Sequence, residues 1–140
     1  MFHVDIYVAT KGGIKAKDGR YGWVVEYITP SGETKTREGF GAEKDSTSQR
    51  MTLRALIEAF DSLAAECDIT IHVPDPFVRN AIATNKIGCW GIHGGIGAAG
   101  TPIRNAELWN MLYHRQMQHV VRTQEGHFHP YLDWLKRKMR

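Results

Sequence analysis

The stretch from residue 46 to residue 73 constrains the fold more than any other part of this sequence. Apolar side chains repeat there at helical spacing and predict an amphipathic helix of about five turns over residues 46–66: Leu53, Leu56, Ile57, Phe60 and Leu63. Residues 68–73 follow at once and are apolar enough for a strand in the middle of a sheet. Because another strand is predicted before the helix, at residues 3–9, a right-handed crossover should pair the two strands in parallel.

The remaining elements are predicted on both sides of this unit. Residues 11–20 are rich in glycine and lysine and should form a loop. Strands are expected at residues 21–28, 33–42 and 118–123, and helices at residues 76–85, 104–117 and 129–139. The order βββαβααβα predicts one α/β domain over residues 1–140, with a five-stranded mixed sheet and helices on both faces.

The composition and the simple motifs exclude several classes of protein. No apolar run is long enough to cross a bilayer, and the N-terminus does not have the pattern of a signal peptide. Cys67 and Cys89 match no metal-binding spacing and no disulfide framework, so we expect a reducing, cytoplasmic setting. The sequence GIGAAG at residues 95–100 matches a dinucleotide-binding pattern but follows no strand and opens no helix. We therefore expect a flexible loop there and no cofactor.

The net charge of +3 leaves the partner open. Basic residues gather near the N-terminus and in the C-terminal sequence KRKMR; the first group is Lys11, Lys15, Lys17 and Arg20. Two such ends brought together by the fold would make a patch suited to phosphate. A solvated surface with a basic tail explains the same residues, and the charge alone does not distinguish the two.

Six segments carry motifs in a consistent order along the chain. The segment STSQRMTLRALIEAF resembles Thr-Thr-Asn-Asn-Arg-Met-Glu-Leu followed by an alanine-rich helix, and IHVPDPFVRNAI resembles a strand, then Thr-Asp-Ser, then an aromatic-Val-Arg-Asn helix. The other four segments are VDIYVATKGG, RYGWVVEY, IRNAELWNML and EGHFHP. Together they resemble the ribonuclease H family, whose members cut the RNA strand of an RNA–DNA hybrid. The resemblance covers nearly the whole chain and implies an RNase H-like fold.

The resemblance also implies where the catalytic groups of the family would lie. Four carboxylates of the family hold two Mg²⁺ ions, and hard Mg²⁺ requires oxygen ligands. Their positions fall here on Ala9, Thr52, Pro74 and Lys136, so no carboxylate is kept. The loop histidine of the family is kept as His127. We therefore expect no metal site and no ribonuclease activity.

Three other acids lie close in the sequence to the positions of the lost carboxylates or share a face with them. Asp5 shares a face of the first strand with Ala9 but lies roughly 13 Å away along that strand. Asp75 is expected to point away from the site, because adjacent residues of a strand face opposite sides. Asp133, one helical turn before Lys136, is the one acid that fits, and a single acid does not build a two-metal centre.

The residues expected to bind nucleic acid are polar or basic and lie around the former catalytic site: Lys11, Thr47, Ser48, Gln49, His127 and Lys136. A helix N-terminus binds anions, and an ammonium in place of a metal could hold a phosphate. For the residues before the helix, a simple capping role remains open; for Lys136, so does membership of a basic tail. The glycine-rich stretch from Trp90 to Gly100 offers a possible contact with a protein partner.

Three interpretations of function follow, in order of preference. The first is a catalytically inactive RNase H-like domain that binds an RNA–DNA hybrid or duplex backbone with little sequence specificity. The second, from another class, is a scaffold that keeps the fold for protein contacts. The third is an active ribonuclease with a site rebuilt around Asp133 and His127.

Overall fold

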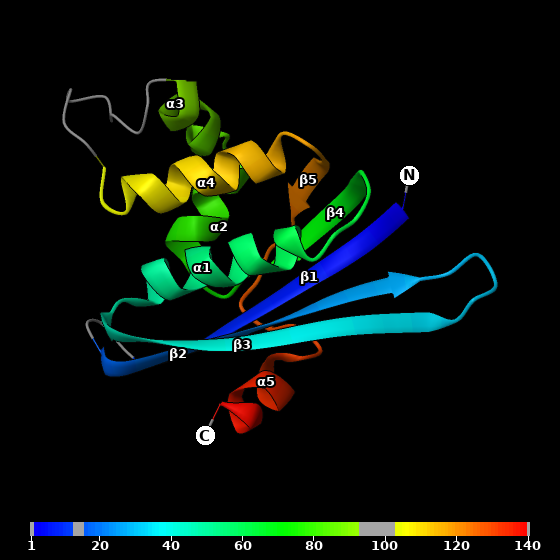
Figure 1. The fold of residues 1–140 in the computed structure, drawn as a ribbon, viewed down its shortest axis with the longest axis horizontal. Helices are drawn as coiled ribbons and strands as arrows, with labels where there is room; N and C mark the ends of the chain where they lie inside the picture. Colours follow the sequence, from blue (N-terminus) through cyan, green and yellow to red (C-terminus); the bar gives the residue numbers. More distant parts are fainter. Residues whose placement is uncertain (1, 13–15, 93–102, 140) are drawn as a thin grey trace.

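The computed structural model describes residues 2–12, 16–92 and 103–139, and its centre is a five-stranded mixed sheet with the strand order β3-β2-β1-β4-β5 (Figure 1). The strands β1, β2 and β3 are antiparallel neighbours, while β4 runs parallel to both β1 and β5. Their bounds are Phe2–Lys11, Ala16–Ile28, Thr34–Ser46, Cys67–His72 and Val120–Thr123 for β1 to β5. The mixed sheet and the predicted parallel pairing of β1 with β4 are confirmed.

The helices lie on both faces of this sheet, as predicted. Of the described helices, α1 to α4 lie on one face and α5 lies on the opposite face (Figure 1). Their bounds are Ser48–Asp61, Pro76–Ala83, Lys86–Ile92, Ala106–Gln116 and Leu132–Lys138 for α1 to α5. Among the described residues, no helix is long and apolar enough to cross a membrane.

The alternation of side chains along β1 divides the apolar interior into two clusters. Val4, Ile6 and Val8 point into the large core, which α1 and α4 complete. Tyr7 and Ala9 point to the other face and join a small cluster, which we call the α5 cluster and which also contains Val24, Leu132, Leu135 and Met139. Two buried faces on one strand explain why α5 is required to cover this end of the sheet.

The element boundaries differ from the sequence predictions in several places, and β3, for example, continues to Ser46 instead of ending at residue 42. The strand β2 begins at Ala16, so part of the expected glycine and lysine loop is strand. Helix α1 ends at Asp61 instead of residue 66, and its C-cap is Ser62, whose hydroxyl donates to the Ala59 carbonyl at 2.7 Å. Helix α3 was not predicted, because its glycines interrupt the helical spacing of Ile87 and Trp90. Residues 95–100 lie outside the described residues.

Candidate functional site

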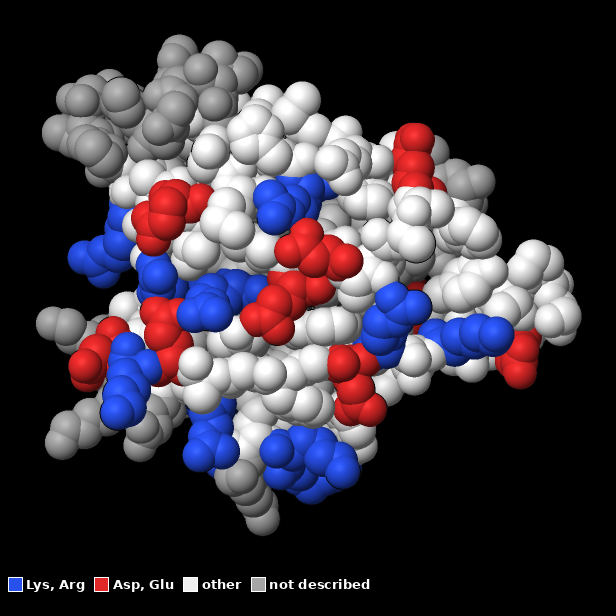
Figure 2. All heavy atoms as spheres, viewed as in Figure 1, with Lys and Arg blue, Asp and Glu red and all other residues white. Residues whose placement is uncertain are grey.

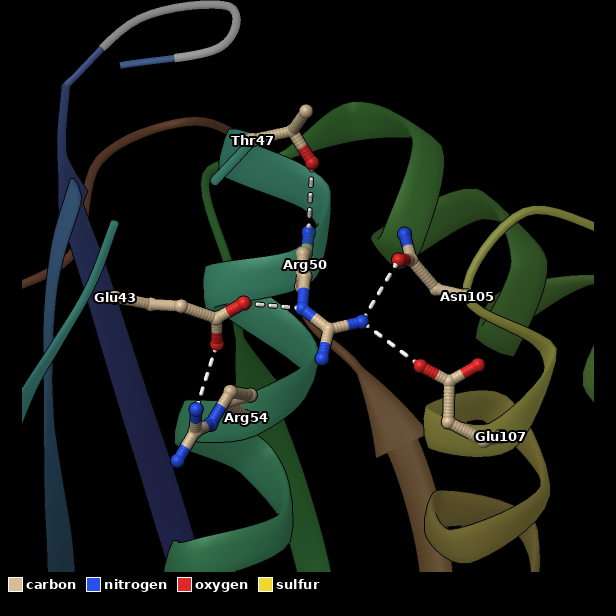
Figure 3. A network of polar contacts seen from close by, with 6 residues as sticks. All are labelled: Glu43, Thr47, Arg50, Arg54, Asn105 and Glu107. Carbon is tan, nitrogen blue, oxygen red and sulfur yellow. Dashed lines mark hydrogen bonds and ion pairs between the residues drawn. The ribbon is translucent and has the colours of Figure 1, made fainter. Parts of the chain in front are cut away.

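A polar network fixes the N-terminal end of α1 (Figure 3). Thr47 is the N-cap, and its hydroxyl accepts a hydrogen bond of 3.2 Å from the backbone N–H of Arg50. The Arg50 guanidinium then donates to Glu43 on β3, to Glu107 at 2.8 Å and to Asn105 at 3.2 Å. One side chain thereby ties the start of α1 to an edge strand of the sheet and to the start of α4.

Charge pairing in this network overcomes the effect of burial. Burial by itself would raise the pKa of Glu43, but hydrogen bonds from Arg54 and Arg50 hold that pKa below its ordinary value. The pKa of Arg50 is raised, because Glu107 and Glu43 both accept hydrogen bonds from it. Both shifts favour the ionised forms of Glu43 and Arg50.

Replacing Arg50 by methionine should lower the free energy of unfolding by about 2 kcal/mol, because Glu43 loses a charged partner in a partly buried place. Arg115→Met is the matched control, since Arg115 makes one ion pair of 2.9 Å with exposed Asp61. That change should cost less than about 1 kcal/mol. Urea unfolding of both variants measures the difference, and equal losses would contradict a special role for Arg50.

A cavity of about 210 Å³ lies where the carboxyl ends of β1 and β4 meet the first turn of α1 and one side of α5. It is lined by residues from five parts of the chain, among them Thr10, Ser48, Pro74, Asp75, His127 and Lys136. The fold thus brings together four positions that the sequence predicted at or near the site: Ser48, Pro74, His127 and Lys136. Thr10 and Asp75 also belong to the cavity, although neither was predicted as a binding residue.

Asp75 belongs to a short hydrogen-bond network inside this cavity. Its Oδ2 accepts a hydrogen bond of 3.0 Å from the Ser48 hydroxyl, which lies 3.5 Å from the Thr10 hydroxyl. Its Oδ1 accepts from the backbone N–H of Val78 at 3.0 Å, which makes Asp75 the N-cap of α2. The prediction that Asp75 points away was wrong: β4 ends at His72, so strand alternation no longer applies three residues later.

The four former carboxylate positions do not supply ligands for a pair of magnesium ions. Ala9 is fully buried in the α5 cluster, and Thr52 is 1% exposed on α1. Pro74 has no side-chain oxygen, and Lys136 carries a positive charge. Asp75 is the one carboxylate among the described residues lining the cavity, and both of its oxygens already accept hydrogen bonds. Hard divalent ions require several free carboxylate or carbonyl oxygens, so this donor set does not fit them.

The other two acids weighed as replacements lie elsewhere. Asp5 pairs with His72, whose Nε2 is 2.8 Å from the Asp5 carboxylate, on the face of the sheet that α5 partly covers. Asp133 is exposed in the first turn of α5 and does not line the cavity. Neither side chain adds a ligand to the site.

The remaining predicted binding residues, Lys11, Thr47 and Gln49, do not line this cavity. Thr47 uses its hydroxyl as the cap of α1, and Lys11 is exposed at the end of β1. Gln49 faces a different cavity of about 330 Å³, which is lined by Phe77, Trp90 and Trp109. The start of α1 therefore directs its consecutive side chains to different places: of Thr47, Ser48 and Gln49, only Ser48 lines the cavity that contains Lys136.

Arg79 positions the loop that carries His127, a role that the sequence analysis did not assign. Its guanidinium donates to the carbonyls of Val73 at 3.0 Å and Gly126 at 2.8 Å. Gly126 has a φ of +105°, a conformation that favours glycine. The signal was available, because Arg79 belongs to the Val-Arg-Asn motif of the resemblance.

His129 is held inside the fold and is not free to bind a ligand with His127. Its Nε2–H donates to the Val8 carbonyl at 2.8 Å, and its Nδ1 accepts from the Tyr131 backbone N–H at 3.2 Å. Burial lowers the pKa of His129, so the ring is neutral. His127, by contrast, is exposed at the mouth of the cavity.

Positive charge gathers at the end of α5. Lys136, Arg137 and Lys138 form its last turn. Figure 2 shows acidic and basic side chains mixed over the face that carries α1 and β3, while the lower edge, where α5 lies, is basic. Arg20 on β2 joins this edge, since its guanidinium donates to the Met139 carbonyl at 3.3 Å. The cavity therefore opens beside a local excess of cations.

Comparison with known proteins identifies the family. The model of the RNase H family matches residues 3–129. A Ribonuclease H of Janthinobacterium sp. (strain Marseille) is 34% identical over 129 residues, which cover 91% of this chain and 85% of the relative. A Ribonuclease H of Ruegeria sp. (strain TM1040) is 36% identical over 119 residues, covering 84% and 75%.

Solved structures agree with the fold. LC9-RNase H1, a type 1 RNase H with the type 2 active-site motif, has a TM-score of 0.79 at 23% identity and covers 99% of this chain and 70% of its own. The foamy viral protease-reverse transcriptase, solved in complex with an RNA/DNA hybrid, has a TM-score of 0.67 at 11% identity and covers 88% of this chain and 17% of its own. By its sequence and its fold, this chain belongs to the ribonuclease H family.

Proposed function

We propose that this chain binds the backbone of an RNA–DNA hybrid or related duplex and does not cleave it. The observation that carries the proposal is that Lys136, which the resemblance puts at the position of the fourth family carboxylate, lines the cavity. Of the four positions that correspond to the family carboxylates, one holds a cation, Lys136, and the other three hold uncharged residues. The Lys136 ammonium suits a phosphate oxygen because it can donate hydrogen bonds to it, whereas the Ser48 hydroxyl already donates to Asp75.

The surroundings of the cavity support a contact with phosphate. Ser48 lies in the first turn of α1, where the positive end of a helix of 14 residues favours anions. Lys11, Arg137 and Lys138 add exposed positive charge nearby. Such contacts read the backbone and carry little sequence information, so binding should weaken steeply with salt. The foamy viral neighbour was itself solved with an RNA/DNA hybrid.

A scaffold for a protein partner is the second candidate. Phe77 is 56% exposed and stacks on Trp90 with ring centroids 6.4 Å apart. Exposed aromatic side chains of this kind are common in protein contacts. The stretch from Trp90 to Gly100, which the sequence suggested for such a contact, falls mostly outside the described residues. We also propose a cytoplasmic setting for this chain, which the sequence predicted from Cys67 and Cys89. Both cysteines are free.

The decisive experiment incubates a labelled RNA–DNA hybrid with the protein in Mg²⁺ or Mn²⁺ and measures cleavage and binding separately. We expect a saturable complex at low salt and no cleavage, with the Ribonuclease H of Janthinobacterium sp. as the positive control. EDTA should leave the affinity unchanged, because no metal takes part.

Two results would overturn the proposal in different ways. Clean cleavage that EDTA stops and Asp133→Ala abolishes would establish a rebuilt ribonuclease. An absence of binding to hybrid, duplex DNA and double-stranded RNA even at low salt would favour the scaffold. Asp133 is exposed on α5, so its replacement leaves the fold intact and the result interpretable.

A further inference from the structure

A second cavity lies at the opposite end of α1 from the former catalytic site. Because α1 ends at Asp61, it does not cover the part of the sheet where the β2–β3 hairpin extends (Figure 1). The loop after α1 closes over one side of this region and leaves a cavity of about 300 Å³. We call it the hairpin pocket; the apolar residues that form it include Phe2, Val25, Tyr27, Leu63, Ala65 and Cys67.

The floor of the hairpin pocket suits one bulky apolar group. Phe2 is 46% exposed and meets Tyr27 edge to face, with ring centroids 5.1 Å apart. Val25 and Cys67 are buried beneath them. Aromatic edges and faces around an open apolar floor accept a phenyl or branched aliphatic side chain with favourable contacts.

The rim of the hairpin pocket is positively charged. Lys35 and Arg37 both line it from β3, two residues apart and therefore about 7 Å apart on the same face of the strand. Arg37 also donates to the Ser62 carbonyl, which holds the loop after α1 in place. No acidic residue lines the pocket among the residues that the structure describes. An apolar group that enters here would therefore be favoured if negative charges flank it.

The strand that forms the rim also has a free edge. In the described sheet β3 is the outermost strand, and it pairs only with β2. The unpaired N–H and C=O groups of an edge strand can hold an extended peptide as an additional strand. The alternate side chains of such a peptide would point to the face that carries Lys35 and Arg37.

We propose that the hairpin pocket binds an extended acidic peptide segment of a protein partner, with one phenylalanine or similar apolar side chain in the cavity. The apolar floor takes the side chain, Lys35 and Arg37 take the flanking carboxylates, and the edge of β3 takes the backbone. The site is separate from the cavity around Lys136 and would connect the domain to another protein while its nucleic-acid surface stays accessible.

The test uses a fluorescein-labelled peptide with blocked ends, in which three acidic residues precede and three follow a single phenylalanine. Fluorescence anisotropy with the full chain should give saturable binding at 50 mM salt. Lys35→Glu should weaken it about tenfold, and Ala65→Trp, which fills the pocket from an exposed loop position, should weaken it at least as much. Lys44→Glu is the matched control, because Lys44 is exposed on the same strand outside the pocket and should change binding less than twofold.

Companion probes separate this proposal from its alternatives. A peptide with alanine in place of phenylalanine, and one with lysine in place of the acids, should each bind at least tenfold more weakly. Affinity for the hybrid should be the same in Ala65→Trp and the unmodified chain, since the two sites are distinct. If Lys35→Glu and Lys44→Glu weaken peptide binding equally, the effect comes from the net charge of the protein, and the proposal is overturned. Decanoate binding in the pocket while no peptide binds would also overturn it and would indicate a small amphiphile instead.

Discussion

Leu135→Ala should lower the free energy of unfolding by about 3 kcal/mol and weaken hybrid binding at the same time. Leu135 is fully buried in the α5 cluster, where removal of a leucine side chain costs 2–5 kcal/mol in the unfolding free energy. It lies directly over Gly22, since a Cβ built on that glycine would come within 3.1 Å of Leu135 Cδ2. Gly22 pairs with Ala9, so Leu135 holds α5 against the strand ends that border the cavity containing Lys136.

Two controls separate the effects on stability and on binding. Leu112→Ala removes an equally buried leucine from α4 and should cost a similar unfolding free energy, but hybrid affinity at a temperature where the chain is folded should be unchanged. Met117→Ala removes a side chain that is 65% exposed and should cost less than about 0.5 kcal/mol. Unfolding in urea and anisotropy with labelled hybrid measure the two quantities. If Leu112→Ala weakens hybrid binding as much as Leu135→Ala, α5 does not present the binding residues.

The sheet was predictable because its signals are local. Alternation in β1, the helical spacing of α1 and the apolar run of β4 each specify one element, and a right-handed crossover then fixes how they pair. Helix α3, which the sequence did not predict, is short and contains Gly88, a residue type that is typical of loops. Its formation depends on tertiary packing, with Ile87 fully buried and Trp90 against Trp109. A distant packing partner of this kind cannot be read from spacing.

The sequence predicted which residues lie at the candidate site, but it did not predict where their side chains point. Counting along the motifs assigned Pro74 and Lys136 to the site, and both line one cavity. The direction of Asp75 was wrong because strand alternation was extended past the end of β4, where the backbone turns to start α2. The contacts of Ser48 with Thr10 and Asp75 depend on how β1 and α1 are placed relative to each other, which no local sequence pattern gives. Positions follow from sequence, whereas hydrogen-bond partners follow from the packing of elements.

Lys136→Glu should weaken the binding of an RNA–DNA hybrid at least tenfold at low salt, while the free energy of unfolding changes by less than about 0.5 kcal/mol. The side chain is exposed and makes no ion pair among the described residues, so the fold does not depend on it. A carboxylate in its place would repel phosphate and would lie in the same cavity as Asp75. A tenfold loss corresponds to about 1.4 kcal/mol, which is within the range for a charged contact that is reversed.

The neutral variant gives the sharper measurement. If Lys136 holds one phosphate, Lys136→Ala should reduce the slope of log K against log salt by about 0.9. Lys138→Ala is the matched control: it comes from the same turn of α5, and its ammonium lies over the Trp134 ring at 5.7 Å, outside the cavity. A basic tail that acts only through its total charge would give the same change in slope for both variants. A loss specific to Lys136 would mean that the ammonium in the cavity, and not the net charge of the tail, is the group that contacts the backbone.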